Sequence, residues 1–191
     1  DKVCRFFADN IGNTSSANRV AGVLEAEGNL PKAKKGISAG LVSGYVDALV
    51  NAFIFYRAGR YDIKGKELLK TLSKWYIVDM GFRNLLLGYR NADRGHILEN
   101  LVYLELLRRG YTVSIGKIGP LEVDFIATNQ TEKHYIQVTE TMLGEETRAR
   151  ELEPLRKISD NYPKTVLTMD RNFLTNEDGI EIVNLIDWLL G

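Results

Sequence analysis

Residues 94–140 read RGHILENLVYLELLRRGYTVSIGKIGPLEVDFIATNQTEKHYIQVTE, and this stretch decides the fold. Its first part, 94–109, is apolar on nearly every side and predicts a buried helix. Three short runs then alternate or cluster β-branched and aromatic residues, and each predicts a strand: 111–117, 121–127 and 134–140. A charged helix (about 145–160), two strands (164–170 and 179–185) and a short terminal helix complete the chain. The order αβββαβ predicts an α/β domain over 93–191 with a parallel crossover.

The preceding half of the chain has helical periodicity. We expect a first helix that ends at Gly12, a second that begins at Ser15 or Ser16 and stops at Gly28, and a third capped by Ser38. The segment 29–36 predicts a turn. On the third helix, five residues are expected to face inward: Leu41, Val42, Tyr45, Leu49 and Ala52.

After the third helix, the run FIFYRAGRYD at 53–62 predicts a hairpin around Ala58 and Gly59. Three helices followed by a hairpin is the layout of a winged helix, so residues 1–92 are expected to form a winged-helix-like domain. The connection from 74 to 95 predicts a strand, a short helix and a polar loop. Four cations in the hairpin suit phosphate contacts, unless they form only a solvated face: Arg57, Arg60, Lys64 and Lys66.

The net charge of zero conceals an asymmetry. Residues 1–92 contain 14 Lys/Arg and 8 Asp/Glu, whereas residues 93–191 contain 11 Lys/Arg and 17 Asp/Glu. A polyanion would be attracted to the first half and repelled by much of the second. The single cysteine, Cys4, excludes a disulfide framework, and no apolar run is long enough to cross a bilayer. We therefore expect a cytoplasmic protein without membrane contact, and its oligomeric state is left open.

Three polar residues lie in segments that are otherwise apolar, and the neighbouring residues in the sequence offer them no evident partner. Glu99 lies on the apolar helix, with no cationic Lys or Arg three or four residues away, whereas Glu105 has Arg109 as an i,i+4 partner. Strict alternation places Asp124 beside Ile126 on one face of a strongly apolar strand, with Phe125 on the other. Gln137 lies on the next strand. If the two strands pair, Asp124 and Gln137 converge, and Glu99 approaches from the helix.

Such a convergence of oxygen atoms is what magnesium-dependent phosphodiester chemistry requires. Mg²⁺ prefers one or two carboxylates together with waters and substrate phosphate, and an amide oxygen can complete its coordination. The structural alternative is that Glu99 bonds to buried backbone groups and Asp124 pairs with an arginine. From the residues alone, both interpretations stay open.

The series ILEN, ELLRRGY, EVDFIA and IQV resembles the domain that follows the ATPase module in a family of prokaryotic AAA+ proteins of unknown function. That domain is similar to a divergent restriction-endonuclease fold of the PD-(D/E)XK type. The segments SGYVDALVNAFIFYRAGRYD and KWYIVDMGFRNLLLG resemble the winged-helix-like linker of the same proteins. The resemblance implies that the chain is a C-terminal fragment, that a P-loop ATPase module precedes Asp1, and that ATP binds only there, since no GxxxxGK[ST] motif is present.

Carried over residue by residue, the resemblance makes Glu99 the helix carboxylate, Asp124 the central metal-binding aspartate and Gln137 the residue at the (D/E) position, with Mg²⁺ as the implied metal. Thr139 stands where the motif has a lysine that positions the attacking water and neutralises developing charge. Threonine supplies no positive charge. Lys117, on the neighbouring strand, is the candidate that could replace the motif lysine. We expect that it does not.

Three functions follow from these expectations. The first is a DNA-binding region of an AAA+ ATPase, in which the winged helix grips the duplex and the nuclease-like domain is degenerate. The second is an active Mg²⁺-dependent nuclease that uses Glu99, Asp124 and Gln137 as catalytic and metal-binding residues. The third is a pair of protein-interaction modules that regulate the ATPase module without nucleic acid.

Overall fold

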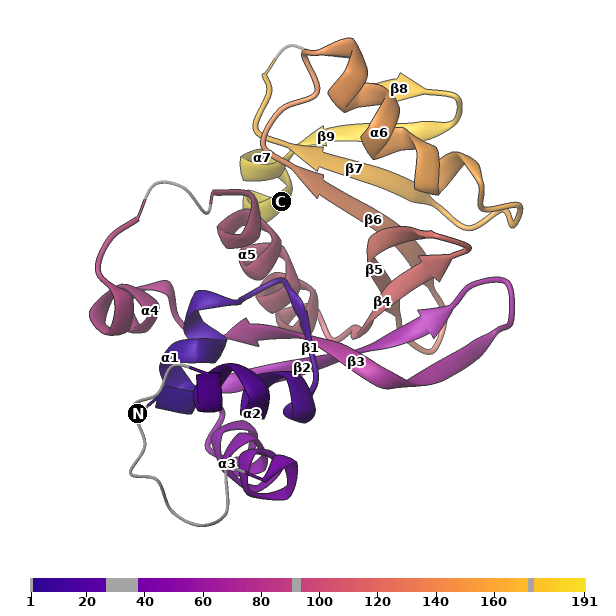
Figure 1. Cartoon of the computed structure of the whole chain (residues 1–191). Coiled ribbons are helices and arrows are strands. Elements are labelled where there is room, and N and C mark those ends of the chain that lie inside the picture. Colours follow the sequence, from indigo (N-terminus) through magenta and orange to yellow (C-terminus); the bar gives the residue numbers. More distant parts are fainter. Residues whose placement is uncertain (1, 27–37, 91–93, 172–173) are drawn as a thin grey trace. The chain divides into compact units, whose positions relative to one another are not determined.

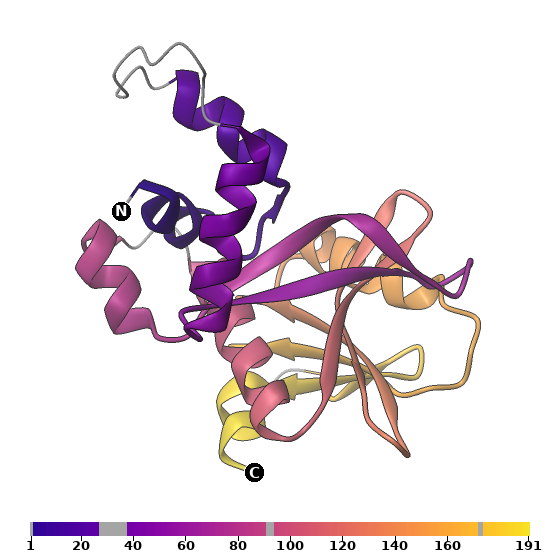
Figure 2. The same ribbon diagram turned by 90° about the horizontal axis from the view of Figure 1, so that it is seen from below.

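The computed structural model describes residues 2–26, 38–90, 94–171 and 174–191 and forms two compact units (Figures 1 and 2). The first unit comprises Asp1–Ala58 and Thr71–Ala92, and the second comprises Gly59–Lys70 and Asp93–Gly191. One boundary therefore falls at the predicted position after residue 92. The other differs from the prediction, because the outer part of the predicted hairpin belongs to the second unit.

Helices dominate the first unit. Its elements are α1 (Lys2–Asp9), β1 (Thr14–Ser15), α2 (Ala17–Ala26), α3 (Ala39–Asn51), the beginning of β2 (Phe55–Asp62), the end of β3 (Glu67–Ile77) and α4 (Met80–Leu87). The Oγ of Ser38 accepts a hydrogen bond from the Leu41 amide and caps α3, as predicted. Phe7 packs against Trp75 with 4.8 Å between ring centroids, and both are buried at the centre of this core. The predicted turn at 29–36 and the predicted helix end at Gly28 lie outside the described residues.

The predicted inner face of α3 is right in part, because Val42 is buried and Leu49 packs against the core. Val42 and Val46 are buried, whereas Leu41 and Tyr45 have exposed fractions of 51% and 55%. Each turn of this helix carries two adjacent apolar residues (Leu41-Val42, Tyr45-Val46 and Leu49-Val50), so the sequence contains two possible inner faces. Packing against α1 and α2 selects the one that contains the β-branched residues.

The predicted position of the hairpin turn is wrong. Ala58 and Gly59 lie inside the continuous strand β2, and the turn to β3 is formed by residues 63–66. Asp62 makes the turn, because its Oδ1 accepts hydrogen bonds from the amides of Lys64 (3.1 Å) and Gly65 (3.2 Å). Between β1, β3 and β2, the hydrogen-bonded order is β1-β3-β2, and β1 was not predicted.

The second unit has the predicted order of helices and strands. It contains α5 (Arg94–Arg108), β4 (Thr112–Ile118), β5 (Leu121–Thr128), β6 (Lys133–Thr139), α6 (Glu145–Arg156), β7 (Lys164–Thr168), β8 (Asn176–Glu177), β9 (Ile180–Asn184) and α7 (Leu185–Leu190). The elements α5, β4, β5, β6, α6 and β7 thus reproduce the order αβββαβ. The short strand β8 was not predicted.

A mixed sheet forms the middle of the second unit, with the strand order β2-β4-β5-β6-β7-β9-β8. Strands β4, β5 and β6 pair antiparallel, while β6, β7 and β9 pair parallel. The connection from β6 to β7 runs through α6, as a parallel crossover requires. The fold class is therefore mixed α/β, as predicted.

Helices cover the two faces of this sheet. Phe125 of β5 meets Tyr103 of α5, with 6.0 Å between ring centroids. On the other face, Leu152 and Leu155 of α6 join a buried cluster that includes Tyr135 of β6. In Figure 2 the sheet can be followed between α5 and α6.

Candidate functional site

A β-bulge lies at the centre of β5. Ser114 pairs with Ile126 and Gly116 pairs with Val123, so β5 has one residue more than β4 between these two pairs. The bulge breaks the predicted alternation: Val123 and Ile126 both join the cluster beneath α6. A bulge redirects side chains and is common near functional sites. Here the redirected residues are Asp124 and Phe125.

Gly116 makes room for this bulge. A Cβ atom at position 116 would lie 2.9 Å from the Cβ of Val123 and 3.1 Å from the Cδ1 of Ile63. Both distances are shorter than ordinary van der Waals contact. A side chain at this position would therefore push β5 away from β4.

Asp124 and Gln137 meet across β5 and β6, as predicted. Phe125 pairs with Ile136, which places Asp124 and Gln137 at the next position along the ladder. The Asp124 amide donates to Oε1 of Gln137 (3.2 Å), and the Val138 amide donates to Oδ2 of Asp124 (2.9 Å). Their side chains thus supply hydrogen bonds between β5 and β6 next to the Phe125–Ile136 pair.

A carboxylate from α6 joins this pair. Nε2 of Gln137 donates to Oε2 of Glu151 (3.0 Å), and Nη2 of Arg150 donates to Oε1 of Glu151 (2.8 Å). Glu151 is 8% exposed. The charged run 145–157 predicted only a solvated helix, so Glu151 was missed. The available signal was its position four residues before Leu155, on the inner face of α6.

Glu99 lies on the buried side of α5. Its Oε2 is 3.8 Å from Nδ1 of His96, a residue that was not expected to contact it. Two contacts fix the direction of α5 over the sheet: Arg94 pairs with Glu140 at the end of β6 (3.0 Å), and Tyr103 meets Phe125. Glu99 lies on α5, which covers the face of the sheet that contains Phe125, whereas Glu151 reaches Gln137 from α6 on the other face.

The position of the missing lysine is occupied by a hydroxyl that faces the following loop. Oγ1 of Thr139 donates to the carbonyl oxygen of Thr141 (3.2 Å), and Thr139 is 8% exposed. Lys117 lies on β4 and pairs in register with Glu122, two residues before Asp124 along β5. The main chain of Lys117 accepts a hydrogen bond from the Ile63 amide. The main chain of Lys117 thus joins β4 to the turn between β2 and β3.

The donor set does not fit Mg²⁺ in the observed arrangement. Oε1 of Gln137, Oδ2 of Asp124 and both carboxylate oxygens of Glu151 accept hydrogen bonds from protein groups. Mg²⁺ demands near-octahedral oxygen coordination at about 2.1 Å, which these hydrogen bonds oppose. Within residues 2–26, 38–90, 94–171 and 174–191, no three His, Cys, Asp or Glu side chains are grouped as metal ligands.

Of the four predicted phosphate-binding cations, two are exposed in the β2–β3 turn of the second unit. These are Lys64 and Lys66. Arg60 lies on β2, before the turn, and its Nη2 is 3.9 Å from Oε2 of Glu122. Arg57 is exposed and belongs to the first unit.

A cage of three tyrosines steadies the same hairpin. Nζ of Lys133 lies 4.7 Å from the ring centroid of Tyr135, 4.9 Å from that of Tyr162 and 5.8 Å from that of Tyr61. Nζ is also 3.6 Å from Oδ2 of Asp160, which accepts a hydrogen bond from the Tyr135 hydroxyl (2.6 Å). Burial and this hydrogen bond raise the pKa of Tyr135. Because Tyr61 lies at the end of β2, the cage ties the hairpin to β6.

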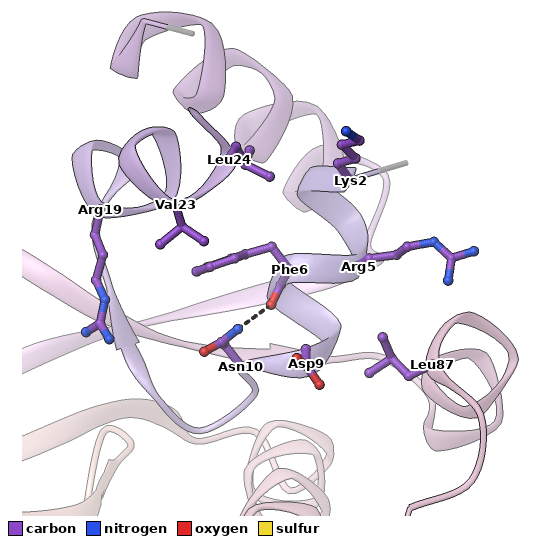
Figure 3. A pocket seen from close by; sticks show the side chains of 9 residues that line it. All are labelled: Lys2, Arg5, Phe6, Asp9, Asn10, Arg19, Val23, Leu24 and Leu87. Atoms are coloured by element: carbon purple, nitrogen blue, oxygen red, sulfur yellow. Dashed lines mark hydrogen bonds between the residues drawn. The ribbon is translucent and has the colours of Figure 1, made fainter. Parts of the chain in front are cut away.

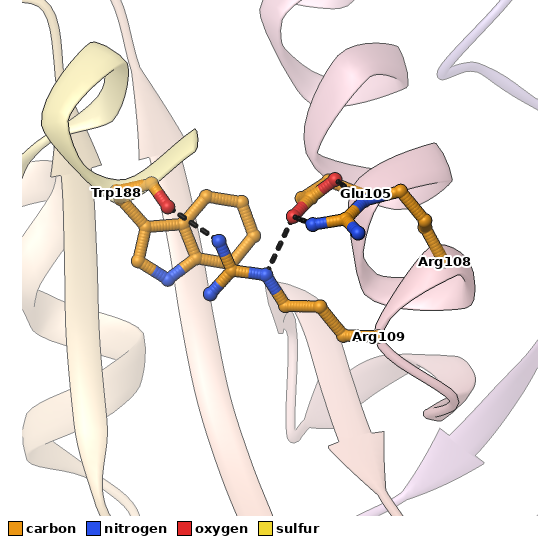
Figure 4. Close-up of polar contacts among 4 residues, drawn as sticks. All are labelled: Glu105, Arg108, Arg109 and Trp188. Carbon is orange, nitrogen blue, oxygen red and sulfur yellow. Dashed lines mark hydrogen bonds and ion pairs between the residues drawn. The ribbon is translucent and has the colours of Figure 1, made fainter. Parts of the chain in front are cut away.

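The C-terminal helix is fastened to α5 by a separate cluster (Figure 4). The guanidinium carbon of Arg109 lies 4.2 Å from the ring centroid of Trp188. Nε of Arg109 donates to Oε1 of Glu105 (2.6 Å), which confirms the predicted i,i+4 pair, and Arg108 also contacts Glu105. Hydrogen bonds from Arg108 and Arg109 lower the pKa of Glu105 to about 2.

The sheet and its covering helices define a mixed α/β protein. No family model matches the chain. It is similar to an uncharacterised protein of Haemophilus influenzae, with 42% identity over 98% of this chain and 45% of that protein. It is also similar to an uncharacterised protein of Methanocaldococcus jannaschii, with 28% identity over 97% of this chain and 40% of that protein. The chain thus spans less than half the length of these relatives. No solved structure matches it.

Among the described residues, no helix has the length and apolar character that a bilayer crossing requires.

Proposed function

We propose that this chain is a nucleic-acid-binding region whose second unit is a degenerate nuclease-like domain. The observation that carries the proposal is the environment of Gln137. Its amide oxygen accepts from the Asp124 main chain and its amide nitrogen donates to Glu151. Because both the oxygen and the nitrogen of this amide are hydrogen-bonded, Gln137 offers no free ligand where a nuclease would bind its metal.

Two features support a PD-(D/E)XK ancestry for the second unit. The first is the order αβββαβ with an antiparallel β4-β5-β6 sheet followed by parallel β7. The second is the bulge that turns Asp124 toward Gln137 on the adjacent strand. Both are features of the backbone, so they persist after a catalytic side chain has been replaced.

Loss of cleavage follows from the chemistry of the replaced residues. Thr139 stands at the lysine position, and its hydroxyl bonds to the main chain of Thr141. Gln137 stands at the acidic position and cannot contribute a negative charge to a metal. Without the lysine and the second carboxylate, neither water activation nor charge neutralisation has a group to perform it.

Nucleic acid would be held through its phosphates by the hairpin. Lys64 and Lys66 are exposed in the turn that Asp62 forms, and mobile ammonium groups of this kind contact phosphate without reading sequence. The helical layout of the first unit supports the winged-helix interpretation. Its third helix, α3, carries Asp47 as its only charged residue, so α3 is not expected to contact phosphates.

The second candidate is an active Mg²⁺-dependent nuclease. It is favoured by Glu151, a further carboxylate whose Oε2 lies 3.0 Å from Nε2 of Gln137. In that case, substrate binding would have to break the hydrogen bonds of Gln137. The hydrogen bonds of Gln137 and Thr139 favour the first proposal.

The partnership with an AAA+ ATPase module remains part of the proposal. More than half of each relative's length lies outside the matched stretch, which leaves room there for a P-loop module. A regulatory role through protein contacts is the third candidate. The exposed Leu41 and Tyr45 on α3 favour it, because they present apolar surface without basic residues.

The proposal is tested by fluorescence anisotropy with a labelled DNA duplex at several salt concentrations. We expect binding that weakens as salt rises, and a shallower salt dependence in the double variant Lys64→Gln/Lys66→Gln. The control is Lys157→Gln, which removes an exposed cation at the C-cap of α6, away from the hairpin. Salt-independent binding, or equal affinity of the hairpin variant and the wild type, would contradict DNA binding through the hairpin.

A further inference from the structure

A cavity of about 410 Å³ opens in the first unit between α1, α2 and the end of α4 (Figure 3). Its apolar lining comes from Phe6, Val23, Leu24 and Leu87. Phe6 is half-buried and lies in the middle of the labelled side chains in Figure 3, with Val23 and Leu24 beside its ring. The volume falls in the range of small-molecule sites, about 300–1,000 Å³.

The charged residues of the cavity are unequal in sign. Lys2, Arg5 and Arg19 contribute three cations, whereas Asp9 is the only carboxylate. The charge of Asp9 is balanced by Arg90, which is not in the lining and whose Nη1 lies 2.6 Å from Oδ1 of Asp9. The lining therefore contains more cationic than anionic side chains.

The three cations extend in different directions. In Figure 3, Arg19 extends beside Val23 on α2, whereas Lys2 and Arg5 of α1 point away from the Phe6 ring. Arg5 donates a hydrogen bond to the carbonyl oxygen of Leu86, which holds its side chain toward α4. A ligand whose apolar body rests on Phe6 and Val23 can thus reach the Arg19 side chain of α2.

We propose that this cavity binds a small amphipathic anion, meaning an aromatic or aliphatic body that carries a carboxylate, sulfonate or phosphate group. The apolar body is buried against Phe6, Val23 and Leu24. The anionic group pairs with Arg19, since guanidinium groups form strong charge-assisted hydrogen bonds with such anions. This inference does not depend on the nuclease-like centre or on the basic hairpin.

The probe is 8-anilinonaphthalene-1-sulfonate, which combines an aromatic body with one negative charge and fluoresces when its body is buried. We expect saturable binding to the whole chain. Arg19→Gln should weaken it roughly tenfold, because one charge-assisted hydrogen bond is lost. Val23→Phe should also weaken it by filling the cavity. Lys157→Gln serves as the control for the loss of one positive charge, and circular dichroism confirms that each variant is folded.

Competition identifies the ligand class. Octanoate should displace the probe at concentrations at which acetate does not, because only octanoate has an apolar body to bury. The proposal is overturned if the wild type shows no saturable binding or if folded Arg19→Gln and Val23→Phe bind the probe as the wild type does. Equal displacement by acetate and octanoate would also overturn it, because the site would then recognise charge alone.

Discussion

The main-chain amide of Asp124 donates a hydrogen bond to the side-chain oxygen of Gln137 at 3.2 Å. This bond joins β5 to β6 next to the β-bulge that β5 forms against β4. A glutamine satisfies the site because its amide has both an acceptor for the Asp124 amide and a donor for Glu151. A glutamate, the ordinary residue of the motif, has no donor at neutral pH.

Gln137→Glu should therefore destabilise the protein. The new carboxylate would replace a hydrogen bond to Glu151 by repulsion between two largely buried charges, at a cost of about 1–3 kcal/mol. Urea unfolding at neutral pH measures the change in the free energy of unfolding. Addition of Mn²⁺ should restore part of the loss, since a cation can bridge the carboxylates.

The control for this substitution is Gln130→Glu in the exposed turn between β5 and β6. It makes the same chemical change in solvent and should stay within about 0.5 kcal/mol of the wild type. Equal stability of Gln137→Glu and the wild type would show that Glu151 does not constrain Gln137.

Glu105 should make stability depend on acidity. Its pKa is about 2 in the folded protein, against 4.5 as its ordinary value. The unfolded chain therefore takes up the proton first, so the stabilisation is fully present above about pH 4.5 and is lost as the pH falls toward 2. We expect a contribution of about 1–2 kcal/mol, reduced by the exposure of Arg108.

Thermal unfolding of Glu105→Gln at a series of pH values between 2 and 6 tests this dependence. The variant should lose stability above pH 4.5 and approach the wild type near pH 2. Glu153→Gln, which removes a half-exposed ion pair with Lys157, is the control and should change little. A parallel pH profile for Glu105→Gln and the wild type would contradict the assignment.

Arg109 should not tolerate replacement by lysine. Its planar guanidinium stacks 4.2 Å from the Trp188 ring centroid while it also bonds to Glu105, and an ammonium cannot do both. Arg109→Lys should cost about 1 kcal/mol in urea unfolding and increase amide exchange in α7. Arg108→Lys is the matched control, because Arg108 is exposed and has no contact with Trp188 in Figure 4. Similar losses in both variants would count against the stacking contact.

Lys133 should hold the basic hairpin in place. Lys133→Gln removes the cation from the three-tyrosine cage, and we expect faster hydrogen exchange at the Ile63 amide, which bonds to Lys117. Lys133→Arg keeps the charge and should restore much of the protection. If both variants exchange at the rate of the wild type, the cage does not support the hairpin.

The sequence predicted the second unit well because its elements are local. The apolar helix at 94–109 and the three strand-like runs each have an unambiguous periodicity, and their order alone indicates the mixed sheet. The meeting of Asp124 and Gln137 followed from simple strand pairing. The bulge did not, because no residue in EVDFI marks it; it becomes apparent only when Gly116 is seen opposite.

The sequence failed where two local patterns compete or where partners are distant. Ala58-Gly59 resembles a turn, but Asp62 forms the actual turn by capping the amides of Lys64 and Gly65. Leu41 and Tyr45 form one apolar stripe of α3 and Val42 and Val46 another, and only packing chooses between them. Glu151 looked solvated because its partner, Gln137, is on a different element.

The most direct test incubates a labelled DNA duplex with the protein in Mg²⁺ or Mn²⁺ and follows binding and strand integrity in the same samples. We expect a salt-dependent complex in which the DNA stays intact, for the wild type and for Asp124→Ala alike. Cleavage by the wild type that disappears in Asp124→Ala, or the absence of any complex at low salt, would contradict it.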